Sequence, residues 1–395
     1  MRLVAASCPT DTVYVGLAMD AGTRDEEEKE SGMAHFAEHL SFKGTTRRTS
    51  RQIITRMESV GGDMNAFTGK EETVYYCTCR REHFGRAVDL LFDIVFNSTY
   101  PREAMEKEAE VVTDEIESYN DSPSELIYDD FEAMLFHGHP LGRNILGDAD
   151  RLRQYDSTDV ARYTGRLYIP ERAALFVYGN IAIPEILRHI PDIPAAAATV
   201  RNAVRTMPDE EYRPEEKVIC KDTHQTHIMM GARAYGGSER KRTALLLANN
   251  ILGGPGLSSR LNLALREKRG LVYTVESTLT TYTDAGLWAV YFGCDHKDAA
   301  KCKRLVRNEL RRLCDAPLPE KTLNAAKRQL TGQIALSYDN FESVAIGMGK
   351  RMLHYNRTQT GEEMIQAIRA LTPEQVWEAA REVFNPERLT ILEYR

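Results

Sequence analysis

Two histidines four residues apart, His35 and His39, lie in the stretch GMAHFAEHLSFKGT, with Glu38 beside the second histidine. Positions i and i+4 of an α-helix lie on the same face, so both imidazoles can reach one metal ion. Glu38 is at i+3 from His35 and reaches the same place without having to bind the metal. Two histidines, one carboxylate and an open fourth position are typical of a catalytic zinc site. Glu38 is then the natural base that takes a proton from water during attack on a carbonyl.

The third ligand of such a site has to come from elsewhere in the chain, because the five-residue pattern alone also arises by chance. The helix predicted after Pro101, PREAMEKEAEVVTDEIESY, contains seven acidic residues, most of which should face solvent. Glu108 and Glu115 stand out, because they lie two turns apart on one face beside the apolar Val111 and Val112. Spacing alone does not decide which of the two would bind the metal.

The order of the predicted elements indicates two domains of one fold. In the first half, a helix at 33–42 and a second helix precede two strands joined by a turn at Gly69-Lys70. A long helix follows. The second half repeats this order, with a helix predicted in SSRLNLALREKRG. In each half, two glycines 17 residues apart bracket a helix, Gly44 and Gly61 in the first and Gly253 and Gly270 in the second. We therefore predict an α+β fold of two similar domains, each with an antiparallel or mixed sheet packed with helices, related by internal duplication.

Two segments lie outside these elements. The stretch IPDIPAAAATVRNAVRTMPDEEYRPEE has neither a helical nor a strand period, which favours an interdomain linker. The predicted division is an N-terminal domain at 1–190, a linker at 191–214 and a C-terminal domain at 215–395. The acidic segment DAGTRDEEEKESG is predicted to be a solvated loop.

Composition narrows the class of protein. The chain has 395 residues, 42% of them apolar and 28% charged, as in a soluble globular protein. A net charge of −7 without a basic block argues against nucleic acid as a partner. Neither a membrane-spanning run nor a signal peptide is recognisable, so we expect a cytoplasmic protein without a membrane partner. The seven scattered cysteines, Cys77 and Cys79 included, favour free thiols over disulfides or a zinc knuckle.

Several longer motifs resemble those of the pitrilysin family of inverzincin zinc peptidases, which includes insulin-degrading enzyme and the mitochondrial processing peptidase. The motifs are HFAEHLSFKGT, GGDMNAFTGKEETVYY, EAEVVTDEIESYNDSP and HPLGRNILGD in the first half, and GGPGLSSRLNLALREKRGLVYTVES in the second. They follow the family's order along nearly the whole chain. The resemblance implies a small two-domain, bacterial-type zinc endopeptidase that hydrolyses oligopeptides or unfolded segments.

The resemblance assigns the residues of the zinc-binding catalytic domain. It implies that His35, His39 and Glu115 hold one Zn²⁺ per chain, because Glu115 ends the family pattern E-x-x-V-V-x-x-E. Glu38 matches the catalytic base. Glu108 matches the carboxylate that orients a ligand histidine.

The resemblance also implies where the substrate binds. The edge strand that contains Asn65, Ala66 and Phe67 matches the segment to which the family adds its substrate as an extra strand. Arg266 and Tyr273, in the C-terminal substrate-binding domain, match the pair that positions the substrate carbonyl and stabilises the oxyanion. Without the resemblance, Arg266 would read as a helix surface charge and Tyr273 as an ordinary strand residue.

The chain contains both the zinc-site residues and the pair Arg266 and Tyr273. By the same resemblance, this implies a self-sufficient enzyme. Family members of this length pair as homodimers whose four similar domains enclose a chamber, so folded proteins should be poor substrates. The alternative is a partner-dependent or catalytically silent subunit, similar to the processing peptidase subunits. Peptide hydrolysis by the purified chain alone separates the two interpretations.

Overall fold

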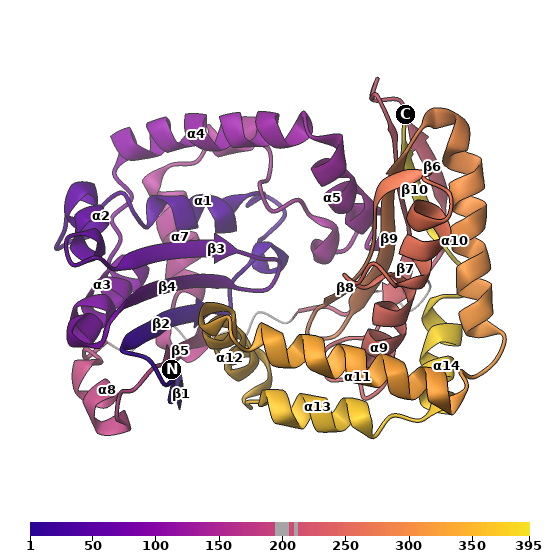
Figure 1. Cartoon of the computed structure of the whole chain (residues 1–395). Helices are drawn as coiled ribbons and strands as arrows, with labels where there is room; N and C mark the ends of the chain where they lie inside the picture. The colour runs from indigo at the N-terminus through magenta and orange to yellow at the C-terminus, as the bar shows by residue number, and fades with distance from the viewer. Residues whose placement is uncertain (194–204, 209–211) are drawn as a thin grey trace. The chain divides into compact units, whose positions relative to one another are not determined.

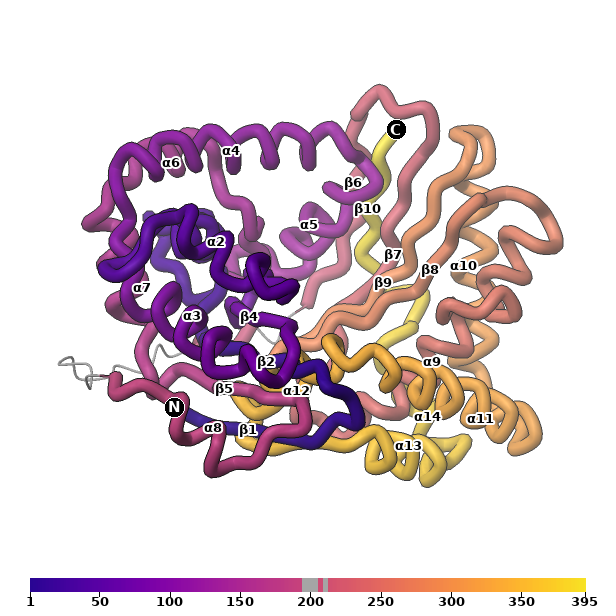
Figure 2. Tube along the Cα trace, turned by 60° about the vertical axis from the view of Figure 1, so that its left-hand side comes forward, coloured from indigo at the N-terminus to yellow at the C-terminus, as the bar shows by residue number. Residues whose placement is uncertain are grey.

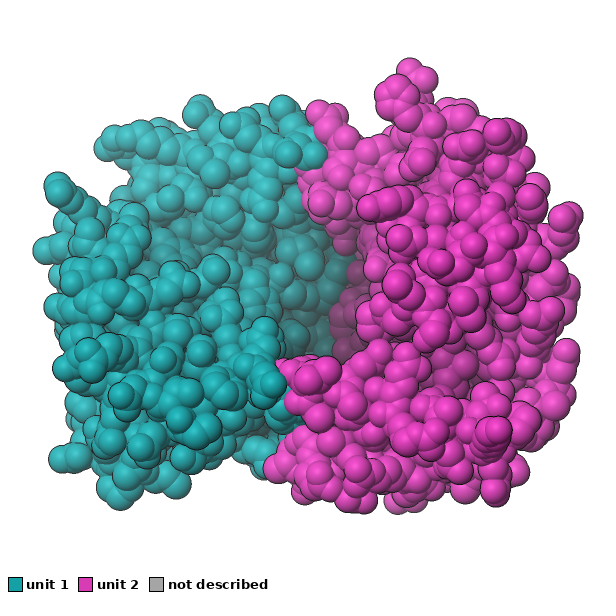
Figure 3. Space-filling view, in the orientation of Figure 1, with its two compact units in different colours: residues 1–118, 143–205, 338–359 teal, residues 119–142, 206–337, 360–395 magenta. Residues whose placement is uncertain are grey.

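The computed structural model describes residues 1–193, 205–208 and 212–395 (Figure 1). They form two compact units (Figure 3). Unit 1 comprises residues 1–118, 143–205 and 338–359, and unit 2 comprises residues 119–142, 206–337 and 360–395.

Unit 1 is built on a five-stranded sheet with the strand order β1-β5-β2-β4-β3. The parallel pair is β1 with β5, and the other neighbours are antiparallel, so the sheet is mixed and β3 forms one edge. The strands are β1 (Arg2–Ala6), β2 (Thr12–Met19), β3 (Asp63–Thr68), β4 (Thr73–Arg80) and β5 (Ala173–Tyr178). The helices are α1 (Met33–Leu40), α2 (Ser50–Glu58), α3 (Phe84–Phe96), α4 (Arg102–Asn120), α6 (Ala149–Leu152), α7 (Ser157–Leu167), α8 (Ile183–His189) and α12 (Phe341–Tyr355).

The period-two pattern of the strands places apolar side chains on both faces of this sheet. In β2, Val15 and Leu17 belong to the main core, which they share with α1, α3 and α7. Ala18 faces the opposite side, in a smaller cluster with Phe176 of β5 and with α12. Helix α12 comes very close to β5, because a Cβ at Gly349 would lie 2.3 Å from the Phe176 ring.

Unit 2 repeats this architecture with the strand order β6-β10-β7-β9-β8. Its parallel pair, β6 with β10, occupies the same place as β1 with β5. The strands are β6 (Glu216–Ile219), β7 (Thr226–Ala234), β8 (Val272–Thr281), β9 (Gly286–Cys294) and β10 (Thr390–Tyr394). The helices are α5 (Pro123–Leu135), α9 (Arg242–Gly253), α10 (Ala299–Cys314), α11 (Glu320–Ser337), α13 (Gly361–Arg369) and α14 (Pro373–Val383). The predicted α+β duplication is therefore confirmed.

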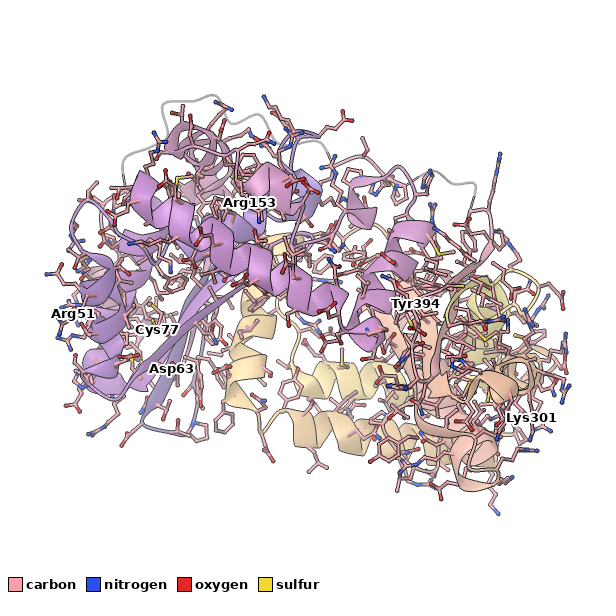
Figure 4. The ribbon with its side chains drawn as sticks, turned by 90° about the horizontal axis from the view of Figure 1, so that it is seen from above. Arg51, Asp63, Cys77, Arg153, Lys301 and Tyr394 are labelled. Carbon is pink, nitrogen blue, oxygen red and sulfur yellow. The ribbon has the colours of Figure 1, made fainter. Side chains whose placement is uncertain are left out.

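Two helices belong to the unit formed mainly by the other half of the chain. Helix α5 follows α4 in sequence but packs on the unit 2 sheet. There Tyr394 of β10, labelled in Figure 4, lies close to α5 and donates a hydrogen bond to Asp130 at 2.5 Å. Helix α12 follows α11 but lies beside β2 and β5 of unit 1 (Figure 2). The predicted domains are continuous, at 1–190 and 215–395, and do not include this exchange of helices. A helical hydrophobic pattern shows that a helix buries one face, but not which sheet that face covers. The predicted linker 191–214 lies in large part outside the described residues.

The segment SSRLNLALREKRG differs from the prediction of an α-helix, because its middle forms a π-helix at Asn262–Glu267. Gly270 follows it with φ +57°, and Gly61 follows α2 with φ +71°. Both are left-handed conformations that favour glycine at the end of a helix. The matching glycines of the two halves therefore have the same structural role.

Candidate metal centre

Helices α1 and α4 of unit 1 bring the predicted metal ligands together. Nε2 of His35 and Nε2 of His39 are 3.2 Å apart. Oε2 of Glu115 lies 3.9 Å from the first of these nitrogens and 3.7 Å from the second. In the part of the chain that the structure describes, this is the only group of three or more His, Cys, Asp or Glu side chains that could hold a metal ion.

The arrangement of these atoms fits a zinc ion. Nitrogen ligands about 2.0–2.1 Å from zinc in a tetrahedral site lie about 3.3–3.4 Å from each other, close to the distance between the two imidazoles. Burial, reinforced by neighbouring His39, lowers the pKa of His35 to about 3. His35 is therefore neutral at physiological pH, the form that binds metals.

The orientation of His39 is fixed by a carboxylate that does not belong to the ligand set. Its Nδ1 lies 2.9 Å from Oε1 of Glu108, and Nζ of Lys43 lies 2.5 Å from the other oxygen of that carboxylate. Burial alone would lower the pKa of His39, but the hydrogen bond to Glu108 and the nearby carboxylates raise it. Burial would raise the pKa of Glu108, but its bonds to His39 and Lys43 lower it. Glu108 thus stays ionised and turns Nε2 of His39 toward the site.

Glu38 has the environment that a general base requires. The side chain is buried, and its Oε2 accepts a 2.6 Å hydrogen bond from the Thr68 hydroxyl. Burial raises the pKa of Glu38, although the Thr68 bond and His39 act against the rise. A carboxylate whose pKa moves toward neutrality is a better proton acceptor and donor at physiological pH.

The beginning of α1 is held by a buried acid in the segment that was predicted to be a solvated loop. That prediction is wrong for Arg24, Asp25, Glu26 and Glu30, which are all buried. The Glu26 carboxylate accepts hydrogen bonds from the backbone N–H groups of Ala34 at 2.9 Å and Gly32 at 3.3 Å. These are donors that the first turn of a helix leaves unpaired. Glu26 therefore fixes the end of α1 from which His35 projects.

The predicted substrate strand lies at the edge of the unit 1 sheet. Asn65, Ala66 and Phe67 belong to β3, which pairs with β4 on one side only. Thr68, the last residue of β3, bonds to Glu38. The free edge of β3 therefore runs beside the helix that carries the histidines (Figure 1).

Arg266 and Tyr273 lie close together in unit 2. The guanidinium carbon of Arg266 is 5.6 Å from the centre of the Tyr273 ring, within the range of a cation–π interaction. Arg266 belongs to the π-helix, and Tyr273 lies where the pairing of β8 with β9 is irregular. Both irregularities are common at functional sites, where they redirect a side chain. Tyr273 is 82% exposed, so packing does not explain its presence.

Three contributors to the metal centre were missed by sequence reasoning: Glu26, Lys43 and Thr68. Lys43 was detectable in principle, because it lies four residues after His39. Thr68 was detectable in the same sense, because it directly follows the predicted substrate residues 65–67 in a motif already placed at the site. Glu26 acts on the site only through the fold, and its acidic surroundings carry no signal of it. None of the described helices is long and apolar enough to cross a bilayer.

Comparison with known families and proteins finds matches along nearly the whole chain. Residues 2–149 match the family described as Insulinase (Peptidase family M16), and residues 155–330 match the Peptidase M16 inactive domain. An uncharacterized zinc protease of Bacillus subtilis is 30% identical over 391 residues, which cover 98% of this chain and 94% of that protein. An uncharacterized zinc protease of Mycobacterium leprae is 33% identical over 391 residues, covering 98% of this chain and 87% of that protein.

Solved structures share the fold. The crystal structure of a protease from Helicobacter pylori superposes with a TM-score of 0.90 at 20% identity, covering all of this chain and 96% of that one. A structure described as a peptidase M16 inactive domain, from Pseudomonas fluorescens, gives a TM-score of 0.88 at 21% identity, covering 99% and 94% of the two chains. With the family match over both halves and relatives aligned over nearly their full length, the chain belongs to peptidase family M16.

Proposed function

We propose that the chain is a zinc-dependent endopeptidase that cleaves oligopeptides or unfolded segments. The observation that carries this proposal is the meeting of His35, His39 and Glu115, with ligand atoms all within 4.8 Å of one another, beside the buried carboxylate of Glu38. The names of the relatives, zinc proteases, support the same reaction class.

The residues of unit 1 divide the work of hydrolysis. His35, His39 and Glu115 would hold the zinc ion, whose Lewis acidity lowers the pKa of water and polarises a carbonyl. Glu38 takes the proton from the attacking water and returns it to the leaving amine. The Thr68 hydroxyl holds the Glu38 carboxylate in one orientation, and Glu108 does the same for the His39 ring. The base and one of the metal ligands are thus each held in a single orientation.

Substrate would bind as an additional strand on the free edge of β3, along Asn65, Ala66 and Phe67. Backbone hydrogen bonds supply the affinity in this mode, so the segment that binds has to be extended and folded proteins are excluded. Arg266 and Tyr273 would donate hydrogen bonds to the carbonyl oxygen as it gains negative charge. Because the chain contains both residue sets, we propose that it works as a homodimer of self-sufficient subunits. Its free cysteines support a reducing compartment such as the cytoplasm.

The test is hydrolysis of a mixed quenched-peptide library by the purified chain, first loaded with zinc, then stripped by a chelator, then restored. We expect cleavage to fall at least about 100-fold on stripping and to return with one zinc equivalent per chain. Circular dichroism of the stripped protein controls for unfolding. Absence of cleavage by the zinc-loaded chain would favour the alternative, a partner-dependent or silent subunit.

A further inference from the structure

A cavity within unit 2 has no role in the proposed hydrolysis. Its volume is about 640 Å³, in the range of small-molecule sites. One wall comes from residues 260–269, which include the π-helix, and the other from α10 and residues 316–319. Leu263, Leu305 and Leu318 give the cavity an apolar lining.

The charges around this cavity are unbalanced. Four cations line it, Arg260, Lys268, Arg269 and Arg312, against the single carboxylate of Glu309. Glu309 is already bonded to Arg312 at 2.6 Å. The lining therefore carries an excess of positive charge that the protein does not neutralise.

Arg260 differs from the other three cations of the lining, because those three are exposed. Its side chain is partly buried, and among the described residues it makes no hydrogen bond or ion pair. Burial lowers the pKa of Arg260, and the nearby Arg312 lowers it further, against the pull of Glu309. A guanidinium has five N–H donors, and those of Arg260 are not used by hydrogen bonds within the described residues. An anion in the cavity could accept from them in a bidentate geometry.

A cavity of similar volume in unit 1 shows that arginines alone do not indicate a ligand. It measures about 650 Å³, and its four arginines are matched by four carboxylates. Arg56 pairs with Asp89 at 3.2 Å, and Arg81 pairs with Glu185 at 3.2 Å. This lining is electrically balanced by the protein itself, whereas the unit 2 lining is not.

We propose that the unit 2 cavity binds a small organic anion with an apolar body, its charged group on Arg260 and its body against the three leucines. The π-helix that lines the cavity also carries Arg266, so an occupant would bias the conformation of that helix and act as an effector. This second part rests on the proposed function of Arg266, whereas the binding itself does not.

Binding is tested with the zinc-loaded full chain and 8-anilinonaphthalene-1-sulfonate, a fluorescent aromatic anion. Its uncharged analogue N-phenyl-1-naphthylamine is the control for apolar binding. We expect Arg260→Gln to weaken binding of the anion about 10-fold or more, the size of a charge-assisted hydrogen bond, and to leave the analogue unaffected. Arg304→Gln, an exposed arginine of α10 outside the lining, should bind the anion like the wild type. Arg260→Lys keeps the charge and should retain most of the affinity for the anion. If Arg260→Gln is unstable, Arg260→Lys is the variant whose binding is measured in its place.

Equal affinities of the wild type and Arg260→Gln for the anion, with both proteins folded, would overturn the site. The effector role has its own readout, hydrolysis of a peptide followed by chromatography. Saturation with the anion should change kcat/KM of the wild type at least about twofold and leave Arg260→Gln unchanged. An unchanged rate at saturation overturns the effector role. An inactive enzyme with intact, Arg260-dependent binding would instead refute the proposed hydrolysis.

Discussion

Units 1 and 2 have the same strand order but different chemistry at the same places in the fold. Counting from the paired glycines Gly44 and Gly253, the positions of His35, Glu38 and His39 on α1 correspond to Ala244, Leu247 and Ala248 on α9. Counting from the first residues of α4 and α11, Glu108 corresponds to Ala326 and Glu115 to Gln333. Each of these five residues thus has an apolar or neutral counterpart in unit 2.

Unit 2 fills the space beneath α9 with a neutral hydrogen-bond network. The Asn249 amide donates to the Ser277 carbonyl at 3.0 Å, and the Ser277 hydroxyl donates to Asn249 Oδ1 at 2.5 Å. The Trp288 indole donates to the Ser277 hydroxyl at 2.8 Å. Such a network satisfies its own buried groups and needs no ion. The fold therefore supplies a scaffold, and a handful of side chains decide whether it binds a metal.

Tyr273→Phe tests whether unit 2 contributes to catalysis although its described residues form no metal-binding group. Its effect on activity should exceed that of Glu108→Gln or Asn249→Ala. Loss of one donor to the oxyanion should lower kcat/KM about 100-fold. Zinc content and melting temperature should stay unchanged, because the side chain is 82% exposed. Steady-state kinetics, metal analysis and thermal unfolding measure the three quantities. A variant as active as the wild type would confine the chemistry to unit 1.

Glu108→Gln sharpens the distinction between metal ligands and the residues that orient them. The variant weakens the hold on the His39 ring and removes the ion pair with Lys43, so zinc affinity should fall about 10–100-fold. Competition with a chromophoric chelator measures the affinity. Glu110→Gln, an exposed residue of the same helix, is the matched control and should bind zinc normally. Equal affinities of the two variants would remove Glu108 from the metal centre.

Asn249→Ala tests the neutral hydrogen-bond network of unit 2. Of the three variants, it should have the smallest effect on activity. The change removes the acceptor of the Ser277 hydroxyl, one of the two acceptors of the Trp288 indole and the amide donor to the Ser277 carbonyl. The free energy of unfolding should therefore fall by about 2–3 kcal/mol. Denaturant titration measures this loss, while the zinc content should remain that of the wild type. Asn250→Ala is the neighbouring control, because the Asn250 amide nitrogen has no partner among the described residues. This variant should lose less of the free energy of unfolding. A loss of zinc from the Asn249→Ala variant would contradict the claim that this network of unit 2 is independent of the metal centre of unit 1.

Sequence reasoning recovered the features that depend on local spacing. The i, i+4 histidines, the helix that bears Glu108 and Glu115, and the repeated order of helices and strands along the chain all follow from periodicity and glycine positions. The choice of Glu115 over Glu108 as the ligand candidate required the family resemblance, because both lie on one helical face. Only the fold shows that Glu108 lies against Nδ1 of His39 while Glu115 lies near Nε2.

Features that depend on packing between distant segments could not be predicted. Glu26 appears in an acidic run that looks solvated, yet it is buried because the first turn of α1 needs acceptors for its N–H groups. The exchange of α5 and α12 is equally invisible, since each has a buried face that would fit either sheet. The π-helix at 262–267 differs from an α-helix only in the register of its backbone hydrogen bonds, which side-chain patterns do not report.

The most direct measurement of the central claim compares the zinc-loaded wild type with Glu38→Gln, in both zinc content and peptide hydrolysis. Gln keeps the shape of the side chain and leaves the three ligands in place, but it cannot accept the proton. We expect both proteins to hold one zinc equivalent and the variant to cleave about 100- to 10,000-fold more slowly. Glu58→Gln, at the end of α2 on the surface, should behave like the wild type. A Glu38→Gln variant that holds zinc and cleaves at the wild-type rate would contradict the assignment of Glu38 as the base and, with it, the proposed mechanism.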